Sequence, residues 1–558
     1  MWVLDYSDMD IKKAIEAINI DVENISDPNL KTIILGLLNI IEALSMENKE
    51  LRDENQTLRD ENNRLKGEQG KPDIRPQKKD SKDISSENER KSHDKKKKKK
   101  DKSKKHKIKI DHTIKCEVDK SQLPDDAIFK GYLPVVVQDI IIRTDNIEFQ
   151  KEVYYSSSHR KTFIASLPTG YQGEFGPNVK AQIVSLHCIA KMTESAIVEF
   201  LESHGLFISA ATVSRIITDN HEPFHQEKKD IVQAGLPSTI YQQMDDTGAR
   251  VNGKNYYTHI LCNEYYTAYF TRPNKERLTI LEILTQGELT FRFDESAYAL
   301  MEQMNLSHKT QVRLRQMEPK EVMNRQEVDK FLSELFPDPK KHLTNRRIIL
   351  EASAIIAYQQ LPHTIPLLLT DDAPQFKQIT KLLALCWVHD GRHYKKLDPV
   401  ISLHIIQLEH FLDKYWAYYH KLLAYKQLPT SAVAQALIEE FDSLVSTMTG
   451  YEQLDERIKK TRLKKDSLLL ALKYPSIPLH NNTSELGARI QARYRDISLQ
   501  TKNEKGTESK DTFMTVVATA KKLGVNAYQY ILDRISKKME MPSLASLLLQ
   551  CEAVYNSS

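Results

Sequence analysis

A seven-residue leucine repeat near the amino terminus is the feature that most constrains this chain of 558 residues. The repeated leucines are Leu37, Leu44, Leu51, Leu58 and Leu65. A second seam holds Ile or Asn, and glutamates on one flank face Arg or Lys on the other, as in a parallel two-stranded coiled coil. We expect a zipper over 34–66 within a helical region 1–68, and a homodimer. A single exposed helix is the alternative.

A strongly basic block follows the repeat. Residues 71–110 contain 18 Lys and Arg against 7 Asp and Glu, a net charge of +11, which leaves −7 for the rest of a chain whose total is +4. A segment this basic and this poor in apolar side chains cannot bury enough surface to fold alone. We expect a disordered linker over 69–112 that contacts DNA. A solvated linker without a specific partner is the alternative.

Membrane and disulfide-rich classes do not fit the sequence. The longest nearly apolar run, 33–41, is about half of the roughly 20 residues that a bilayer span needs, and no leader with a cleavage site opens the chain. The cysteines lie far apart, without a Cys-x-x-Cys pair, at Cys116, Cys188, Cys262, Cys386 and Cys551. We expect a cytoplasmic protein with reduced thiols and no membrane partner.

Two small modules are predicted after the linker. Apolar and polar residues alternate over 132–158, which indicates a β module within 113–168. Helical patterns over 194–203 and 210–218 flank His204-Gly205, which is typical of a helix-turn-helix within 175–232. The polar residues left to face a DNA groove are Ser209, Thr212, Ser214 and Arg215. An ordinary helical hairpin is the alternative.

An α/β core is predicted over 238–505. Three β-rich runs, the first two joined by Asn252-Gly253, precede a helix, two more apolar strands and long amphipathic helices. Helical insertions interrupt the core at about 286–364 and 396–478, and helices follow over 506–558. The fold class is therefore multidomain α/β.

Three acids are placed where a metal site could form. Asp245 lies in the first core strand, Asp371 ends the fourth, and Glu485 lies near a helix start. Clustered carboxylates bind magnesium, and two such ions promote phosphodiester displacement. Each acid alone is weak evidence, because the chain has 76 Asp and Glu.

Several motifs together resemble, in chain order, the transposases of the bacterial insertion-sequence-66 family. They are Phe175-Gly176-Pro177, Met244-Asp245-Asp246-Thr247, Leu369-Thr370-Asp371-Asp372, Cys386-Trp387-Val388-His389 with Arg392 and Tyr394, and Asn481-Asn482-Thr483-Ser484-Glu485. The resemblance implies a ribonuclease-H-like Asp-Asp-Glu recombinase core. It makes Asp245, Asp371 and Glu485 the catalytic ligands of two magnesium or manganese ions, with Asp246 and Asp372 in second place.

Other residues are expected to support these acids. Cys386 and His389 are too few for a closed zinc site, so we expect Cys386, Trp387, His389 and Arg392 to support the acids, and a role facing DNA is also expected for His389. A histidine satisfied at a strand end is the alternative for His389. Asn481 and Asn482 are expected to cap the helix of Glu485. Basic residues suited to phosphate contacts are Arg489, Arg493, Arg495, Lys502 and Lys505.

The chain departs from the family's pattern in two places. The family often carries two cysteine pairs after the zipper, whereas this chain has Cys116 with Asp119, and Tyr155-Ser156-Ser157-Ser158. We therefore expect no zinc. His480 and Gly391 also replace residues common in the family, away from the three acids.

The function predicted is a nucleoid-associated DNA transposase. It would bind transposon terminal repeats, cleave phosphodiesters in a metal-dependent reaction and transfer strands into target DNA. A homodimer or larger assembly is expected, and the resemblance implies accessory proteins from the same element. The alternatives are a catalytically silent dimeric DNA-binding protein, either a decayed transposase or a regulator, and a structure-specific nuclease.

Overall fold

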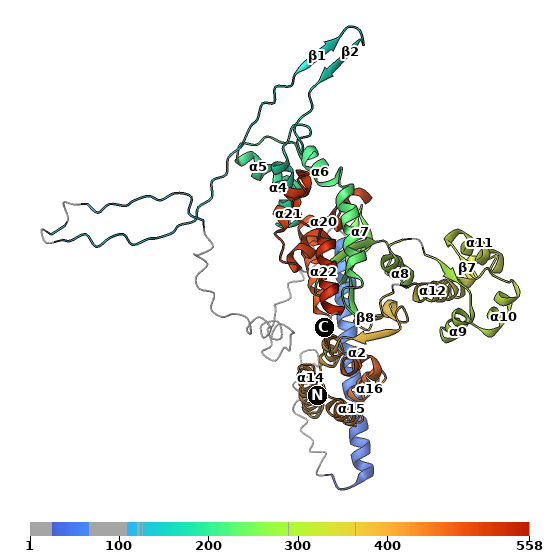
Figure 1. The fold of residues 1–558 in the computed structure, drawn as a ribbon. Coiled ribbons are helices and arrows are strands. Elements are labelled where there is room, and N and C mark those ends of the chain that lie inside the picture. The colour runs from blue at the N-terminus through green and yellow to red at the C-terminus, as the bar shows by residue number, and fades with distance from the viewer. Residues whose placement is uncertain are drawn as a thin grey trace.

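A mixed five-stranded sheet forms the centre of the body (Figure 1). The computed structural model describes residues 25–65, 109–119, 123–124, 127–287, 289–362 and 364–556. The strands are β3 (Tyr241–Val251), β4 (Lys254–Cys262), β5 (Thr267–Arg272), β8 (Leu367–Thr370) and β9 (Leu382–Leu385). Their order is β5-β4-β3-β8-β9; β3 to β5 are antiparallel, and β8 and β9 run parallel to β3. The predicted mixed α/β class is confirmed.

The turn between β3 and β4 has the predicted chemistry. Asn252 and Gly253 both adopt positive φ, 47° and 76°. A two-residue hairpin turn of this hand needs positive φ at both positions, and Asn-Gly supplies it at low cost. The turn thereby sets the register that pairs Asp245 with Ile260.

Helices cover both faces of the sheet. Met244 and Leu261 point into the large apolar core on one face, together with α8 (Arg277–Thr285). Ile260 belongs to the opposite face, which α19 (Asn482–Ser498) covers. Because side chains alternate along a strand, Asp245 shares the α19 face with Ile260.

Helix α20 (Glu504–Lys522) closes the β5 edge of the sheet. Three side chains spaced four residues apart, Asp511, Thr515 and Thr519, accept hydrogen bonds from the outward amides of Thr271, Tyr269 and Thr267. Unpaired edge amides invite association with other chains. Helix α20 thus completes the core rather than trailing from it.

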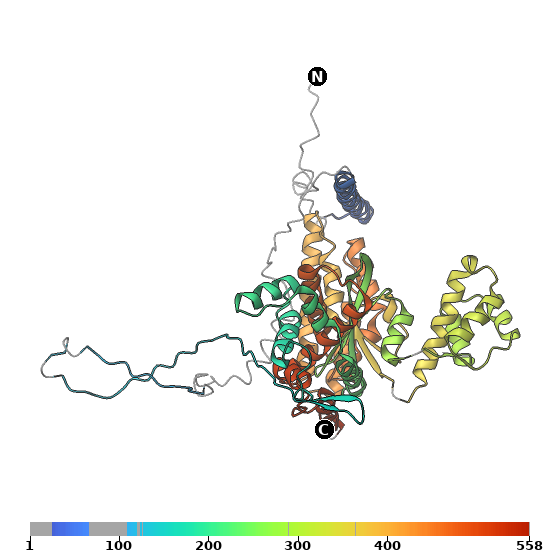
Figure 2. The same ribbon diagram turned by 90° about the horizontal axis from the view of Figure 1, so that it is seen from above.

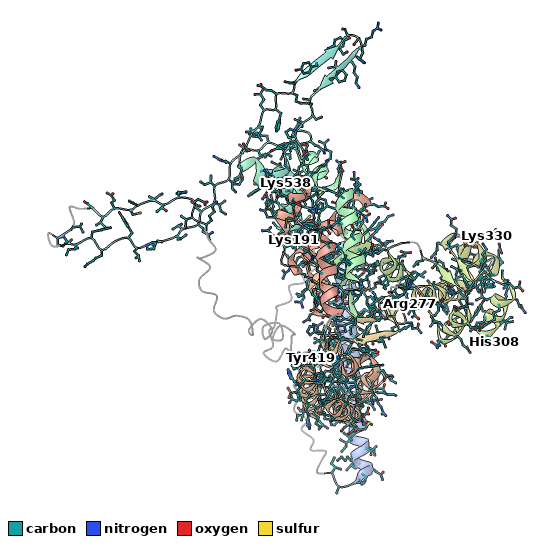
Figure 3. The ribbon with its side chains drawn as sticks, viewed as in Figure 1. Lys191, Arg277, His308, Lys330, Tyr419 and Lys538 are labelled. Atoms are coloured by element: carbon teal, nitrogen blue, oxygen red, sulfur yellow. The ribbon has the colours of Figure 1, made fainter. Side chains whose placement is uncertain are left out.

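The first insertion forms a lobe that projects from the body (Figure 2). Its elements are β6 (Phe291–Arg292), α9 (Glu295–Gln303), α10 (His308–Gln316), β7 (Val322–Met323), α11 (Arg325–Leu335) and α12 (Leu343–Gln359). Arg277 lies at its base, whereas His308 and Lys330 lie at its outer end (Figure 3). Arg277 forms a largely buried ion pair with Glu351 of α12.

The second insertion has an aromatic core of its own. Its helices are α14 (Ser402–Tyr425), α15 (Ser431–Leu444), α16 (Glu452–Arg462), α17 (Lys465–Leu468) and α18 (Leu470–Lys473), and α13 (Trp387–Lys395) precedes them. Strand β9 ends at Leu385, and Trp387 begins α13. Trp387 is fully buried in this core, and its indole N–H donates to the carbonyl of Leu468 at 2.8 Å.

The predicted zipper is one long helix, α2 (Pro28–Leu65). One face packs on the second insertion: Leu38 is buried against Ile401, and the buried carboxylate of Glu42 accepts from the amides of Val400 and Ile401. The repeated leucines with described side chains, Leu37, Leu44, Leu51 and Leu58, are all exposed. The side chain of Leu65, residues 1–24 and most of the basic linker lie outside the described residues.

Within the described residues, α2 is the one helix long and apolar enough over Pro28–Arg59 to cross a bilayer. One such helix near an amino terminus is weak evidence for a span. Its docked face includes the hydrogen-bonded carboxylate of Glu42, which fits a protein contact better than a lipid contact.

The predicted β module is much smaller than expected. Among its described residues, the region forms only a hairpin of β1 (Val153–Ser156) and β2 (Lys161–Ile164), at the end of an extended arm (Figure 1). Ile140 and Ile142, expected to lie in strands, are exposed and unpaired within the described arm. The module has no apolar layer to pack against, and at Asp119 and Ser156 it lacks the thiols that would tie it together.

A helical group borders the body between the arm and the sheet. It contains α4 (Pro177–Cys188), α5 (Glu194–Ser203), α6 (Ala210–Thr218), α7 (Glu222–Gly235), α21 (Ala527–Ile535) and α22 (Leu544–Asn556). Helices α5 and α6 have the predicted bounds and pack through Ile197, Leu201 and Val213.

Candidate active site

Strand register places the first two acids side by side. Strands β3 and β8 pair in parallel, and their last paired residues are Gln243 and Leu369. Asp245 and Asp371 each lie two residues beyond that pair. They therefore lie at the same level and on the same face of the sheet.

Asn481 joins the third acid to this edge. It precedes α19, and its side-chain amide donates to the carbonyl of Met244 at 3.0 Å, one residue before Asp245. The predicted side-chain cap is wrong: Asn481 holds the cap position, but its side-chain oxygen accepts from the Ser484 hydroxyl at 2.6 Å instead of from a backbone amide. Asn482 is buried and also does not cap. Asn481 thus fixes Glu485, one turn into α19, relative to Asp245.

Gly487 lets α19 approach the sheet, a role that sequence reasoning missed. A Cβ atom there would lie 2.7 Å from Cγ2 of Ile260, which is the β4 partner of Asp245. Any larger residue would push α19, and Glu485 with it, away from β3 and β4. The sequence signal that could have predicted this role is the position of Gly487, two residues after Glu485 in a helix.

Asp245 and Asp371 are destabilised as anions. Burial, together with the nearby carboxylates of Asp371, Asp246 and Glu485, raises the pKa of Asp245 to about 7. Burial also raises the pKa of Asp371, with added repulsion from Asp246 and Asp372. Among the described residues, neither carboxylate forms an ion pair with Lys or Arg. Two such carboxylates favour a nearby cation.

Glu485 is held by cations instead. Its oxygens lie 3.3 and 3.5 Å from the guanidinium of Arg392 and 3.7 Å from that of Arg489. His389 Nε2 lies 3.4 Å from Glu485. Burial lowers the pKa of His389, which favours the neutral ring, and its Nε2 then accepts from Arg392 at 3.2 Å.

The three carboxylates are chemically suited to a divalent metal, although they are not close enough together in this structure to coordinate one ion. In the described part of the chain, no three His, Cys, Asp or Glu side chains converge closely enough to hold an ion. Three carboxylates at one sheet edge, two of them without a cationic partner there, are the hard oxygen ligands that magnesium and manganese take. Glu485 would have to turn from Arg392 to join them.

Each of the first two acids is followed by a second aspartate, and these doublets are Asp245-Asp246 and Asp371-Asp372. Unlike the first acid of each doublet, the second has polar or cationic side-chain partners. Asp246 accepts from the Gln375 amide at 2.8 Å and lies 3.7 Å from Lys275. Asp372 pairs with Lys464 at 2.7 Å and Lys377 at 3.1 Å. Although burial opposes them, these two lysines lower the pKa of Asp372. The structure thus distinguishes the two acids of each doublet by their partners.

Cys386 and Trp387 are internal supports. The Cys386 thiol accepts from the amide of Asn481 at 3.3 Å, and burial raises its pKa to about 11, so it stays protonated. Trp387 is buried, which excludes a DNA-facing position for its ring. Gly391 leaves room for Trp416, since a Cβ atom would lie 2.6 Å from that ring.

The helix-turn-helix candidates divide into exposed and internal residues. Ser209 caps α6 through the amide of Thr212, and Arg215 is exposed and donates to the Thr212 hydroxyl. Ser214 turns inward to Glu194 at 3.4 Å, against expectation. Thr212 and Arg215 line a hollow of about 1010 Å³, away from the carboxylates, between α6 and the segment after α21.

The basic candidates near α19 also divide. Arg489, Arg493 and Lys502 are exposed. Arg495 donates to the carbonyl of Gly248 at 2.7 Å, and Lys505 pairs with Asp219 at 2.8 Å, so these two have structural partners.

Comparisons with known proteins identify the family. The family described as "Transposase IS66 family" matches residues 352–509, which include Asp371 and Glu485. An uncharacterized protein, y4jO, of Sinorhizobium fredii is 30% identical over 311 residues, covering 55% of this chain and 94% of the relative. The chain belongs to the IS66 family of transposases.

Proposed function

We propose that this chain is a DNA transposase that cuts phosphodiesters at transposon ends and joins them to target DNA. The observation that carries the proposal is that Asp245 and Asp371 lie side by side on one face of a sheet with strand order β5-β4-β3-β8-β9, while α19, which carries Glu485, packs on the same face. That order and the placement of the acids fit a ribonuclease-H-like core.

Asp245, Asp371 and Glu485 would hold two magnesium or manganese ions. The chemistry supplied by such ions, when bound, is activation of the attacking oxygen and stabilisation of the leaving one. Asn481 and Gly487 keep Glu485 near Asp245, and the packed sheet around Asp245 limits access of bulk water. Arg392 and Arg489, partly exposed beside Glu485, are placed to bind DNA phosphates.

Other elements would hold the DNA and the second protomer. The exposed residues Ser209 and Arg215 suit a groove contact, and Arg489, Arg493 and Lys502 suit phosphates. The exposed leucines of α2 suit pairing with a second copy, although Ile34 and Ile41, at the other seam position, pack on the second insertion. Under this proposal, the DNA partners are the terminal repeats of the transposon and the target DNA. The location is cytoplasmic and nucleoid-bound, and accessory proteins encoded by the same element are expected partners.

The test is strand joining on a labelled duplex of the element's own end, with magnesium. The unaltered protein is compared with Asp245→Asn and Glu485→Gln, which keep side-chain size and remove charge. We expect the unaltered protein to form joined products and the two variants to form none. All three proteins should bind the DNA equally well. Binding without cutting would favour a silent DNA-binding protein, and cutting of branched DNA without joining would favour a nuclease.

A further inference from the structure

A buried charge cluster connects the second insertion to the site. At its centre is Asp390 of α13, whose side chain is 3% exposed. It pairs with Arg457 of α16 and accepts from the hydroxyls of Thr461 at 2.8 Å and Tyr415 at 3.3 Å. A carboxylate this deeply buried needs such partners.

Lys464 connects this cluster to the loop after β8, which carries Asp371 and Asp372. Its amino group lies 3.3 Å from Asp390 and 2.7 Å from Asp372, the residue that follows Asp371. The lysine side chain is only 16% exposed, so these contacts are poorly screened by solvent. Lys464 lies two residues after the end of α16 and holds the N-cap position of α17.

The two ends of this bridge belong to segments that support different acids. Asp372 belongs to the loop that carries Asp371. Asp390 belongs to α13, which also carries His389 and Arg392, the partners of Glu485. A single amino group thus connects the supports of the second and third acids.

We propose that Lys464 is a positioning residue, through which the second insertion holds Asp371 and the partners of Glu485 in one relative placement. The inference rests on the proposed function and deepens it. Residues that orient metal ligands typically change metal affinity 10- to 100-fold when removed. The second insertion would then affect metal binding directly, in addition to any contact that it makes with DNA.

The experiment measures Mn²⁺ binding to the full-length protein without DNA, by the paramagnetic signal of free Mn²⁺. It compares Lys464→Met, Lys464→Arg and the adjacent control Lys465→Met, whose lysine pairs with Asp442 on the surface. We expect Lys464→Met to weaken Mn²⁺ binding about 10-fold or more, Lys464→Arg to recover most of it, and Lys465→Met to match the unaltered protein. In an Asp372→Asn background, Lys464→Met should have a smaller effect.

The outcomes separate the two proposals. Thermal melting shows which variants are folded. If Lys464→Met does not fold, the Mn²⁺ affinity of Lys464→Arg decides whether Lys464 has the proposed role. Mn²⁺ binding by folded Lys464→Met equal to that of the unaltered protein would overturn the role of Lys464. If the unaltered protein binds Mn²⁺ but joins no DNA, the transposase proposal fails, while the Lys464 comparison is still decided by binding. An unaltered protein that binds no Mn²⁺ overturns both.

Discussion

The two insertions interrupt the same sheet but are joined to it in different ways. The first shares the large apolar core beneath β3 to β5 and adds the buried Arg277–Glu351 pair. The second has a separate aromatic core, reaches Asp372 through Lys464 and carries the docked helix α2. The difference suggests that the first insertion mainly stabilises the fold, and that the second mainly arranges the acids and the dimerisation helix.

The largest effect is expected at the base of the first insertion. Glu351→Ala leaves the guanidinium of Arg277, 13% exposed, without its carboxylate, which should cost about 3–5 kcal/mol of unfolding free energy. Thermal and urea unfolding measure it. Mn²⁺ binding by the folded fraction should not change. Glu295→Ala, which breaks an exposed pair with Arg315 in the same lobe, is the control and should have almost no effect. A large loss of Mn²⁺ affinity in Glu351→Ala would contradict the view that the first insertion mainly stabilises the fold.

A pH-dependent effect is expected at Asp245. Its folded pKa of about 7 lies above the unfolded value of about 3.9, so ionisation of Asp245 disfavours the metal-free fold at high pH. Asp245→Asn should therefore stabilise the metal-free protein by about 2–4 kcal/mol above pH 7, and this gain should vanish as pH falls toward 4. Melting in chelator at pH 5 and pH 8 measures it. Asp246→Asn, whose carboxylate has Gln375 and Lys275 as partners, should show no such gain. A gain that is the same at both pH values would contradict the burial of Asp245 as an uncompensated anion.

A smaller effect is expected where α2 docks on the second insertion. Glu42→Ala leaves the amides of Val400 and Ile401 without an acceptor, which should cost about 1–3 kcal/mol and loosen α2. Limited proteolysis near residue 25 and thermal melting report it. Glu50→Ala, at an exposed position of the same helix, serves as the control. Unchanged protection in Glu42→Ala would show that α2 does not depend on this contact.

Much of the fold was predictable because local signals agreed with it. The β-rich runs and the Asn252-Gly253 turn predicted the antiparallel strands, and the helical patterns on either side of His204-Gly205 predicted α5 and α6. The three acids were found through motifs, and parallel strand ends explain why Asp245 and Asp371 meet. Such signals lie within a few residues of the elements that they specify.

The rest depends on contacts between distant residues. Nothing near Asn481 shows that its amide would bond to Met244 instead of capping α19. Lys464 and Asp372 are 92 positions apart, and only the packing of α13 and α16 brings them together. The β module was overestimated because alternation indicates strand propensity, whereas strands also need a layer to cover them.

The central claim is that the first acid of each doublet is catalytic and the second is not. The most direct measurement compares strand joining by Asp245→Asn with Asp246→Asn, and by Asp371→Asn with Asp372→Asn, on the same labelled DNA. We predict a loss of about 1000-fold or more for Asp245→Asn and Asp371→Asn, because each removes a metal ligand. The neighbouring variants should lose at most about 100-fold. Joining by Asp245→Asn or Asp371→Asn at the level of its neighbour would contradict the account.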